Sequence, residues 1–432
     1  MKSNLKTIVF ALLALSFGSF TTAQTLSSKE KKILQKVELN NEAALAFLEQ
    51  TVNINSGTMN VEGVREVGNL FDAEFKKIGL ETSWIDMPID MKRAGHLFAE
   101  HKGKKGKRLL LIGHLDTVFE KDSPFLKYVK DGDKATGPGV EDMKGGDVII
   151  LYALKALQEV GYLKDTQIIV ALHGDEEESG KPIAVSRKDI IEAAQRSDIA
   201  LGYEASSGFN EATLARRGSS GWELKVTGKR AHSAGIFSEE DGAGAIFEVS
   251  RILNAWYEAL SNEKYLTFNP GIITGGTFAE YDKDKASATA FGKTNVIPQT
   301  VTVAGGLRFI SEEQKATARK KMQEIVDNNL PKTDAKFTYW DSYPAMAPTT
   351  GNEDVMAVLS QVSQDMGHPP VIAYDPMKRG AADISFVAEY IDGLDGLGSM
   401  GGGGHTPQEW IDLTTFEDLT KRTALLIYRL TR

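Results

Sequence analysis

The chain has 432 residues, of which 41% are hydrophobic and 25% are charged. These proportions are typical of globular proteins, and they exclude a disordered chain, a collagen-like repeat and a multi-spanning membrane protein. The formal net charge of −9 argues against non-specific binding to nucleic acid, so no nucleic-acid partner is expected. The sequence contains no cysteine, which excludes disulfide bonds, cysteine-ligated zinc and a thiol nucleophile.

The first 23 residues have the pattern of a secretory signal peptide. Lys2 and Lys6 precede an apolar run from Ile8 to Leu15, and small residues follow up to Ala23. We expect cleavage after Ala23 and a mature protein that is periplasmic or secreted. The alternative is a membrane anchor, but the apolar run is shorter than the roughly 20 residues that a spanning helix needs. No stable membrane anchor is therefore expected.

The next part of the chain has the pattern of an α/β domain. Residues 61–80 carry apolar side chains at helical spacing. Two short apolar runs, Arg108–Gly113 and Gln167–Leu172, predict buried strands, and a helical pattern at Val148–Val160 lies between them. Strand, helix, strand is the pattern of a parallel sheet. We therefore predict an α/β catalytic domain with a mostly parallel central sheet that helices flank.

The pattern changes after residue 216. Alternating segments such as Gly221–Thr227 and Val301–Phe309 predict half-buried strands, and helical patterns cover Asp241–Leu260 and Glu312–Asn329. Two helices on a small, mostly antiparallel sheet make an inserted α+β domain. After Pro331 the α/β pattern returns, with predicted helices near Glu353–Met366 and Thr415–Tyr428. The predicted division is a signal peptide at 1–23, a catalytic domain at 29–216 and 332–432, and an inserted domain at 217–331.

Five motifs with acidic or histidine residues lie at the expected ends of strands or helices, where catalytic groups are commonly held. They are His114-Leu115-Asp116, the glycine-flanked Asp142, the run Asp175-Glu176-Glu177-Glu178, Gly202-Tyr203-Glu204, and the glycine run that ends at His405. Taken singly, each motif has a plain alternative, such as a helix cap for Asp142 or a solvated turn for the acidic run. Together they form a set of nitrogen and oxygen ligands that suits zinc, or else cobalt or manganese. A carboxylate that bridges two such ions leaves room for the water that two-metal hydrolases require.

These motifs resemble those of the zinc-dependent peptidases and deacylases that include glutamate carboxypeptidase, acetylornithine deacetylase, succinyl-diaminopimelate desuccinylase and the aminoacylases. The resemblance runs from about Glu42 to the C-terminus. In the insert, Arg230-Ala231-His232-Ser233 and Asn295-Val296-Ile297-Pro298 resemble motifs of the family's lid domain. The resemblance implies two divalent metal ions, with zinc as the expected metal, and a homodimer formed through the lid.

The resemblance also implies which residues bind the metals. His114 and Glu204 would bind one ion, Glu177 and His405 would bind the other, and Asp142 would bridge them. Because these five residues come from distant parts of the chain, only the fold can bring them together.

Other residues would act on the water and the substrate. Asp116 would orient His114, Glu176 would be the general base, and His232 would stabilise the oxyanion, from the partner subunit in dimeric members. The expected substrate contacts are Asn295, Arg308 and Arg379. Arg379 could bind a carboxylate bidentately, and its alternative is an ion pair with Asp375 or Asp383.

We expect an enzyme that cleaves an amide bond next to a free carboxylate, with a peptide or an N-acyl amino acid as its substrate. It would be a carboxypeptidase, a dipeptidase or an N-acyl amino acid deacylase. Glutamate-cleaving members are expected to carry an arginine where this chain has Tyr343, so the sequence does not predict glutamate as the substrate.

Two other classes of protein compete with this hypothesis. A catalytically inactive metal- or peptide-binding protein on the same fold is one, but such a protein needs no general base, and Glu176 is present. A serine hydrolase is the other. Ser233 beside His232 suggests it faintly, but the sequence has no G-x-S-x-G motif before a helix.

Overall fold

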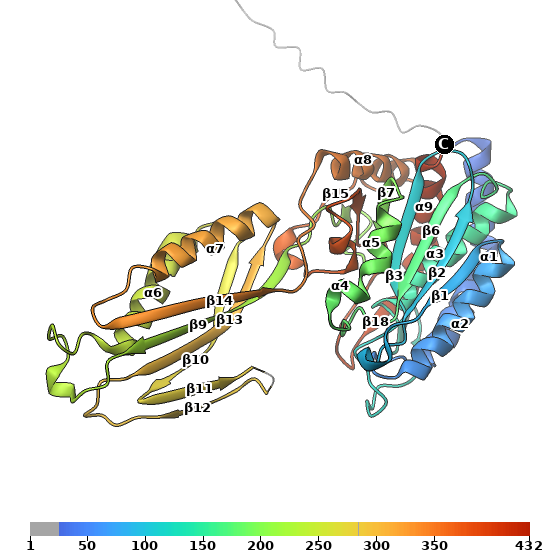
Figure 1. Cartoon of the computed structure of the whole chain (residues 1–432). Coiled ribbons are helices and arrows are strands. Elements are labelled where there is room, and N and C mark those ends of the chain that lie inside the picture. The colour runs from blue at the N-terminus through green and yellow to red at the C-terminus, as the bar shows by residue number, and fades with distance from the viewer. Residues whose placement is uncertain (1–25, 284) are drawn as a thin grey trace, which may run out of the picture.

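The computed structural model describes residues 26–283 and 285–432 as an elongated molecule with two domains (Figure 1). The predicted signal peptide, residues 1–23, lies outside these described residues. Within the described part of the chain, no helix combines the length and the apolar composition that crossing a membrane requires.

A six-stranded sheet forms the centre of the α/β domain, in the order β1-β2-β6-β3-β7-β16. Its strands are β1 (Glu81–Ile85), β2 (His96–Lys102), β3 (Arg108–His114), β6 (Gln167–His173), β7 (Ile199–Gly202) and β16 (Asp392–Leu394). Neighbours from β6 to β16 are parallel, whereas β2 runs antiparallel to both β1 and β6. The prediction of an α/β fold with a mostly parallel sheet is confirmed.

Helices cover both faces of this sheet, because its central strands are apolar on both sides. On one face, Leu109 and Leu111 of β3 belong to a large core with five helices. These helices are α1 (Ser28–Val52), α2 (Val61–Lys77), α3 (Lys144–Glu159), α8 (Thr350–Asp365) and α9 (Leu413–Leu430). On the other face, Leu110 and Ile112 pack with α5 (Lys188–Ala194).

The inserted domain, which we call the lid, lies beside the α/β domain and has a core of its own (Figure 1). Its sheet is antiparallel, and the two helices pack on one face, where the rings of Trp222 and Trp256 are 5.2 Å apart. The sheet consists of β10 (Thr267–Gly276), β13 (Thr300–Phe309), β9 (Gly218–Gly228) and β14 (Thr333–Asp341), and the helices are α6 (Gly244–Leu260) and α7 (Glu312–Val326). A separate antiparallel pair, β11 (Phe278–Asp282) and β12 (Ser287–Phe291), lies next to β10.

The predicted boundary of the lid after Pro331 is wrong, because β14 belongs to the lid sheet. β14 pairs with β9 along its length, with Phe337 opposite Leu224. The lid therefore extends to Asp341. Ala335, Phe337 and Tyr339 alternate as in a strand, but such a pattern does not say which sheet an edge strand joins, and Phe337 is its only buried residue.

Residues 216–219 and 342–346 join the lid to the α/β domain, and we call these two segments the hinge. They are hydrogen-bonded to each other. Arg216 and Met346 exchange main-chain hydrogen bonds of 2.9 and 3.0 Å. The hinge is thus a short antiparallel ladder, not two independent linkers.

Candidate metal centre

The predicted ligands meet at the carboxyl-terminal edge of the central sheet. His114 ends β3, Glu177 follows β6 and Glu204 follows β7. Because these strands are parallel neighbours, their carboxyl ends share one edge, which is where α/β folds hold their ligands. Asp142 precedes α3, and His405 lies in the glycine-rich loop before α9.

Two groups of donor atoms share the carboxylate of Asp142. His114 Nε2 lies 3.3 Å from Asp142 Oδ1 and 3.7 Å from Glu204 Oε1. His405 Nε2 lies 3.1 Å from Asp142 Oδ2 and 3.1 Å from Glu177 Oε2. Within each group, the donor atoms lie within 4.8 Å of one another. The structure thus brings together all five residues that the sequence predicted as metal ligands.

The alternative for Asp142 was a helix cap. The N-cap position of α3 is occupied by Met143, and no side chain caps the helix there. The carboxylate of Asp142 points instead to the two histidines.

The chemistry of the two groups fits divalent cations. Nδ1 of His114 lies 3.0 Å from the main-chain oxygen of Asp116, which assigns the ring proton to Nδ1. Nε2 is then left with its lone pair, and it is buried without a hydrogen-bond partner. Imidazole and carboxylate donors of this kind suit zinc, cobalt or manganese.

The carboxylates also repel one another strongly in the absence of a cation. Burial and the charge of Asp142 raise the pKa of Glu204 to about 8. Burial and the charge of Glu204 raise the pKa of Glu176 well above its usual value. A bound divalent cation is the largest local charge in such a site and removes this repulsion.

Asp116 contacts both His114 and the turn formed by residues 175–178, which we call the acidic turn. Its carboxylate is 3.5 Å from His114 Nδ1, farther than its main-chain oxygen, so the contact that orients the ring comes from the main chain. The carboxylate instead accepts the main-chain N–H groups of Glu176 at 3.0 Å and Glu177 at 3.2 Å, and the hydroxyl of Thr58 at 2.6 Å. Asp116 therefore positions one predicted metal ligand, Glu177, and the predicted general base together.

A cavity of about 530 Å³ opens over the donor groups. Glu176 lines it without belonging to either donor group. Part of its lining is cationic, with Arg216, Lys378 and Arg379. The cavity therefore holds a carboxylate outside the donor groups together with residues that attract anions.

Arg379, which lines this cavity, is held by two oxygen atoms. Its Nη2 donates to Ala205 O at 2.5 Å and to Ser207 Oγ at 2.9 Å, whereas its Nε is buried without a partner. Among the ion pairs of the described residues, none involves Arg379, and Asp383 pairs with Arg187 and His173 instead.

The lid residues that the sequence predicted are split between the two ends of the lid. β9 runs 11 residues away from the hinge, or roughly 33 Å at about 3.3 Å per residue, before the loop that carries His232. Asn295 lies with that loop, since its main-chain oxygen accepts the N–H of Ser233 at 3.0 Å. Arg308 pairs in register with Ser219 at the hinge end. Within one chain, the structure does not bring His232 or Asn295 to the metal ligands.

Glu409 is a site residue that the sequence did not predict. Its buried carboxylate accepts the main-chain N–H groups of Gly139 at 3.1 Å, Glu141 at 2.8 Å and Asp142 at 3.0 Å. Burial raises its pKa to about 7. Glu409 fixes the segment that carries Asp142, and only its place four residues after His405 could have drawn attention to it.

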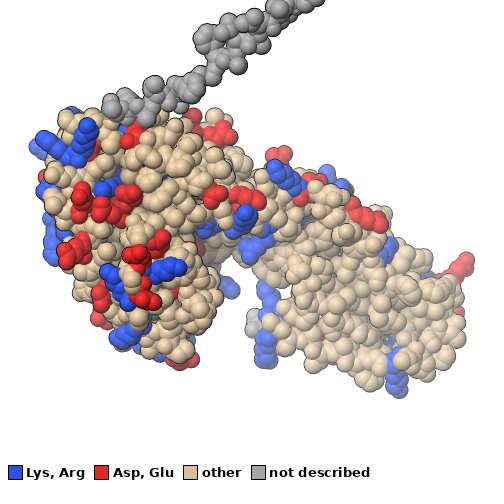
Figure 2. All heavy atoms as spheres, turned by 180° about the vertical axis from the view of Figure 1, so that it is seen from behind, with Lys and Arg blue, Asp and Glu red and all other residues tan. Residues whose placement is uncertain are grey.

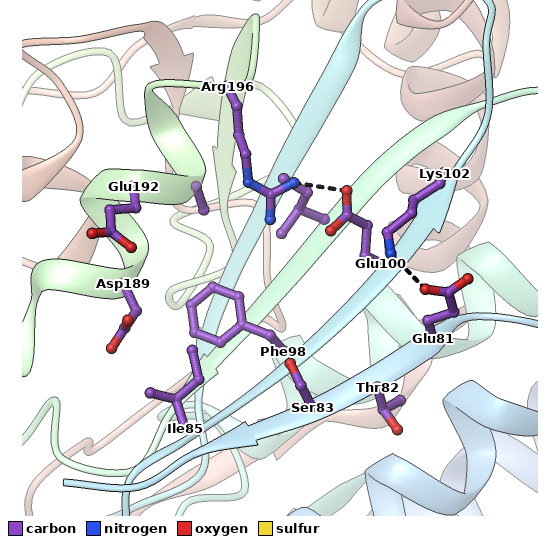
Figure 3. Close-up of a pocket in the computed structure, with 12 residues that line it drawn as sticks. Glu81, Thr82, Ser83, Ile85, Phe98, Glu100, Lys102, Asp189, Glu192 and Arg196 are labelled. Carbon is purple, nitrogen blue, oxygen red and sulfur yellow. Dashed lines mark hydrogen bonds and ion pairs between the residues drawn. The ribbon is translucent and has the colours of Figure 1, made fainter.

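A second cavity, of about 250 Å³, lies between α5 and the edge of the central sheet (Figure 3). Phe98 lines it, and ion pairs join Arg196 to Glu100 and Lys102 to Glu81 at its rim. None of the metal-donor residues lines this cavity. The candidate site is therefore the cavity over Asp142.

Comparison with known sequences identifies the family. Residues 110–429 match the profile of peptidase family M20/M25/M40. Carboxypeptidase G2 of Pseudomonas sp. (strain RS-16) is 28% identical over 98% of this chain and 97% of its own length. Succinyl-diaminopimelate desuccinylase of Gluconobacter oxydans (strain 621H) is 25% identical over 74% of this chain and 80% of its own length.

Solved structures share the fold. Aminopeptidase PepT from Bacillus cereus has a TM-score of 0.72 at 17% identity, over 91% of this chain and 99% of that one. A dinuclear metal-binding peptidase of the M20 family from Bacillus subtilis has a TM-score of 0.62 at 14% identity, over 91% and 99% of the two chains. The resemblance inferred from the motifs is confirmed: the chain belongs to peptidase family M20/M25/M40 and is an enzyme of the metallopeptidase class.

Proposed function

We propose that this protein is a periplasmic or secreted di-zinc hydrolase that cleaves an amide bond next to a free carboxylate. It would act as a carboxypeptidase, a dipeptidase or an N-acyl amino acid deacylase. The observation that carries this proposal is the Asp142 carboxylate, whose two oxygens face two separate donor groups beside Glu176. The names of the relatives, a carboxypeptidase and a desuccinylase, agree with this class of reaction.

Glu176 is the residue for proton transfer. Metal ions held by the two donor groups would lower the pKa of a water and polarise the amide carbonyl. Glu176 would accept the proton of that water and return it to the leaving amine. Glu176 lines the cavity without belonging to either donor group, so its carboxylate stays available for this transfer.

The cationic part of the cavity lining is proposed to bind the free carboxylate of the substrate. Arg379 lines the cavity and has no ion-pair partner among the described residues, so its charge would attract this carboxylate. Arg216 also lines the cavity, but its Nε is paired with Asp395 at 2.6 Å. Tyr343 does not line this cavity, so nothing at that position selects glutamate.

We also propose a homodimer formed through the lid. His232 lies at the end of the lid far from its own metal centre, so only another chain could bring it to the reaction. Phe237 and Phe247 lie close to His232 in sequence and are 67% and 49% exposed, with their rings 5.2 Å apart. Figure 2 shows a face of the lid with few charged side chains. Exposed aromatic rings on a domain with few charged side chains suit contact with a partner subunit.

The test begins with a screen of the zinc-loaded protein against C-terminal dipeptides, N-acyl amino acids and folate-like glutamates, with release followed by mass spectrometry. We expect turnover that a chelator abolishes. Glu176→Gln should lower kcat by about 10²–10⁴-fold and keep both metals by elemental analysis. Glu178→Gln is the matched control, because Glu178 is exposed and paired with Arg93.

Each contrary outcome has its own meaning. Activity that survives chelation would contradict metal dependence. Loss of one metal in Glu176→Gln would mean that Glu176 is a ligand. Full metal content without turnover of any substrate would favour the inactive binding protein. Localisation is tested separately, by N-terminal sequencing of protein recovered from the periplasm or the medium, which should begin at Gln24.

A further inference from the structure

A tyrosine of the hinge contacts the main chain of the proposed general base. The hydroxyl of Tyr343 donates to the main-chain oxygen of Glu176 at 2.9 Å, although 167 positions separate the two residues. The main-chain oxygen of Tyr343 accepts the N–H of Ser219 at 2.8 Å. Tyr343 therefore links the hinge ladder directly to the acidic turn.

A row of hydrogen bonds orients this hydroxyl. Arg187 Nη2 donates to Ser179 Oγ at 3.0 Å, and Ser179 Oγ lies 2.5 Å from the Tyr343 hydroxyl. Because a guanidinium can only donate, Ser179 Oγ accepts from Arg187, and its own hydrogen goes to the Tyr343 hydroxyl at 2.5 Å in preference to the main-chain oxygen of Glu176 at 3.5 Å. The proton of Tyr343 is then directed at Glu176. The charge of Arg187 is balanced by Asp175 and Asp383, both at 2.6 Å.

Packing fixes the ring of Tyr343 in the same place. Its centroid lies 4.9 Å from that of Phe386. The ring lines a separate cavity of about 620 Å³ at the hinge, not the cavity over the metal donors. Tyr343 therefore contacts the main chain of Glu176 from outside the cavity over the metal donors, where it would not touch the substrate.

We propose that Tyr343 is a positioning residue that holds the turn carrying Glu176. Asp116 accepts the main-chain N–H of Glu176, and Tyr343 donates to its main-chain oxygen. With the peptide groups on both sides of Glu176 anchored, the side chain is directed into the cavity. This proposal rests on the proposed role of Glu176 as general base. It also assigns a role to Tyr343, at the position where glutamate-cleaving members are expected to carry an arginine.

The first test is Tyr343→Phe, which removes the hydroxyl and keeps the ring. We expect kcat to fall by about 10- to 100-fold, because small errors in the position of a catalytic group are costly. KM, zinc content and the melting temperature should stay near the wild-type values. Tyr152→Phe is the matched control, since Tyr152 also donates to a main-chain oxygen, that of Ala43, at 2.9 Å, between α3 and α1. It should keep the wild-type kcat.

The second test combines Tyr343→Phe with Glu176→Gln. If Tyr343 acts through the Glu176 carboxylate, the double variant should lose no more activity than Glu176→Gln alone. Ser179→Ala, which removes a donor to Tyr343, should lower kcat in the same direction but by less.

The outcomes separate this inference from the proposed function. Additive losses in the double variant, a kcat loss that follows a loss of zinc, or a wild-type kcat in Tyr343→Phe would each overturn the role of Tyr343. In all three cases the proposed function stands if Glu176→Gln is inactive. A wild-type kcat in Glu176→Gln would instead overturn the proposed function itself.

Discussion

The carboxylate of Glu409 accepts the main-chain N–H of Asp142 at 3.0 Å, across 267 positions of sequence. The same oxygen accepts the N–H of Glu141, and the other oxygen accepts that of Gly139. The segment that carries Asp142, which both donor groups share, is therefore held by a residue outside both groups. Residues that orient ligands in this way commonly affect metal affinity almost as much as the ligands do.

Glu409→Gln is predicted to weaken zinc binding by about 10- to 100-fold. The amide keeps the size of the carboxylate. Its NH₂ group, however, must face a main-chain N–H group and cannot accept a hydrogen bond from it. Zinc titration with a competing chelator measures the change. Glu417→Gln on α9, whose carboxylate pairs with Lys421, is the control and should bind zinc as the wild type does. Equal affinities in the two variants would contradict the role of Glu409.

Asp142→Ala is predicted to lower zinc content more than His405→Ala. Asp142 faces both donor groups, whereas His405 belongs to one. Elemental analysis of the purified variants should find zinc lost from both positions in the first case and mainly from one in the second. Unchanged zinc in Asp142→Ala would remove the basis of the two-metal centre.

Arg379→Lys is predicted to raise KM by about 10- to 100-fold for substrates with a free carboxylate, because a lysine cannot reproduce the planar guanidinium fork. The same substitution should change little for a substrate whose carboxylate is amidated. Arg196→Lys, at the rim of the second cavity (Figure 3), should leave both KM values unchanged. A kcat effect without a KM effect would place Arg379 elsewhere in the reaction.

His232→Ala is predicted to keep full zinc content and to lower kcat by about 10²–10³-fold, the usual loss for one oxyanion donor. Mixing it with Glu176→Gln should restore activity, because one site of each mixed dimer receives an intact base and an intact histidine. At equal mixing, about a quarter of the wild-type activity should return in a symmetric dimer. The absence of recovery after proven subunit exchange would show that His232 does not act across subunits.

His96 is predicted to make the protein less stable in mild acid. Burial, and then the charge of His173, lower the pKa of His96 to about 3, below the value of about 6.5 in an unfolded chain. The unfolded state therefore gains a proton first as the pH falls. The stability that neutral His96 provides is complete above pH 6.5 and is lost progressively toward pH 3.

At pH 5.5 this loss is about 1.4 kcal/mol, one pH unit below the unfolded value. Denaturant unfolding of the zinc-loaded wild type at pH 7.5 and 5.5 should show the loss, and His96→Gln should lack that part of it. His101→Gln, on the same strand and partly exposed, should keep the wild-type slope. An unchanged slope in His96→Gln would contradict the prediction.

The sequence predicted the central sheet and the ligand set because each left a local signal. β3 and β6 contain continuous apolar runs, His114 is the last residue of β3, and Glu177 follows β6 within the acidic turn. β14 also alternates, at Ala335, Phe337 and Tyr339, but that local pattern could not show that the strand pairs with β9 in the lid.

The contacts that hold the site could not be read from the sequence in the same way. Glu409 and Tyr343 act on main-chain atoms of residues far away along the chain, and a main-chain partner leaves no mark on residue type. Nor could the sequence reveal that His232 and Arg308 lie at opposite ends of the lid, because that depends on the direction of β9 and β13.

Because the lid is inserted into the α/β domain, the two domains can complete their folding only in a fixed order during translation. The core of the lid uses residues from Trp222 to Ala345 only, so it can pack as soon as that stretch has left the ribosome. The core of the α/β domain instead needs Phe416 and Leu425 of α9, and the second donor group needs His405. The inserted domain can therefore fold while its host is still incomplete, and the last member of the donor groups is synthesised only when translation is nearly complete.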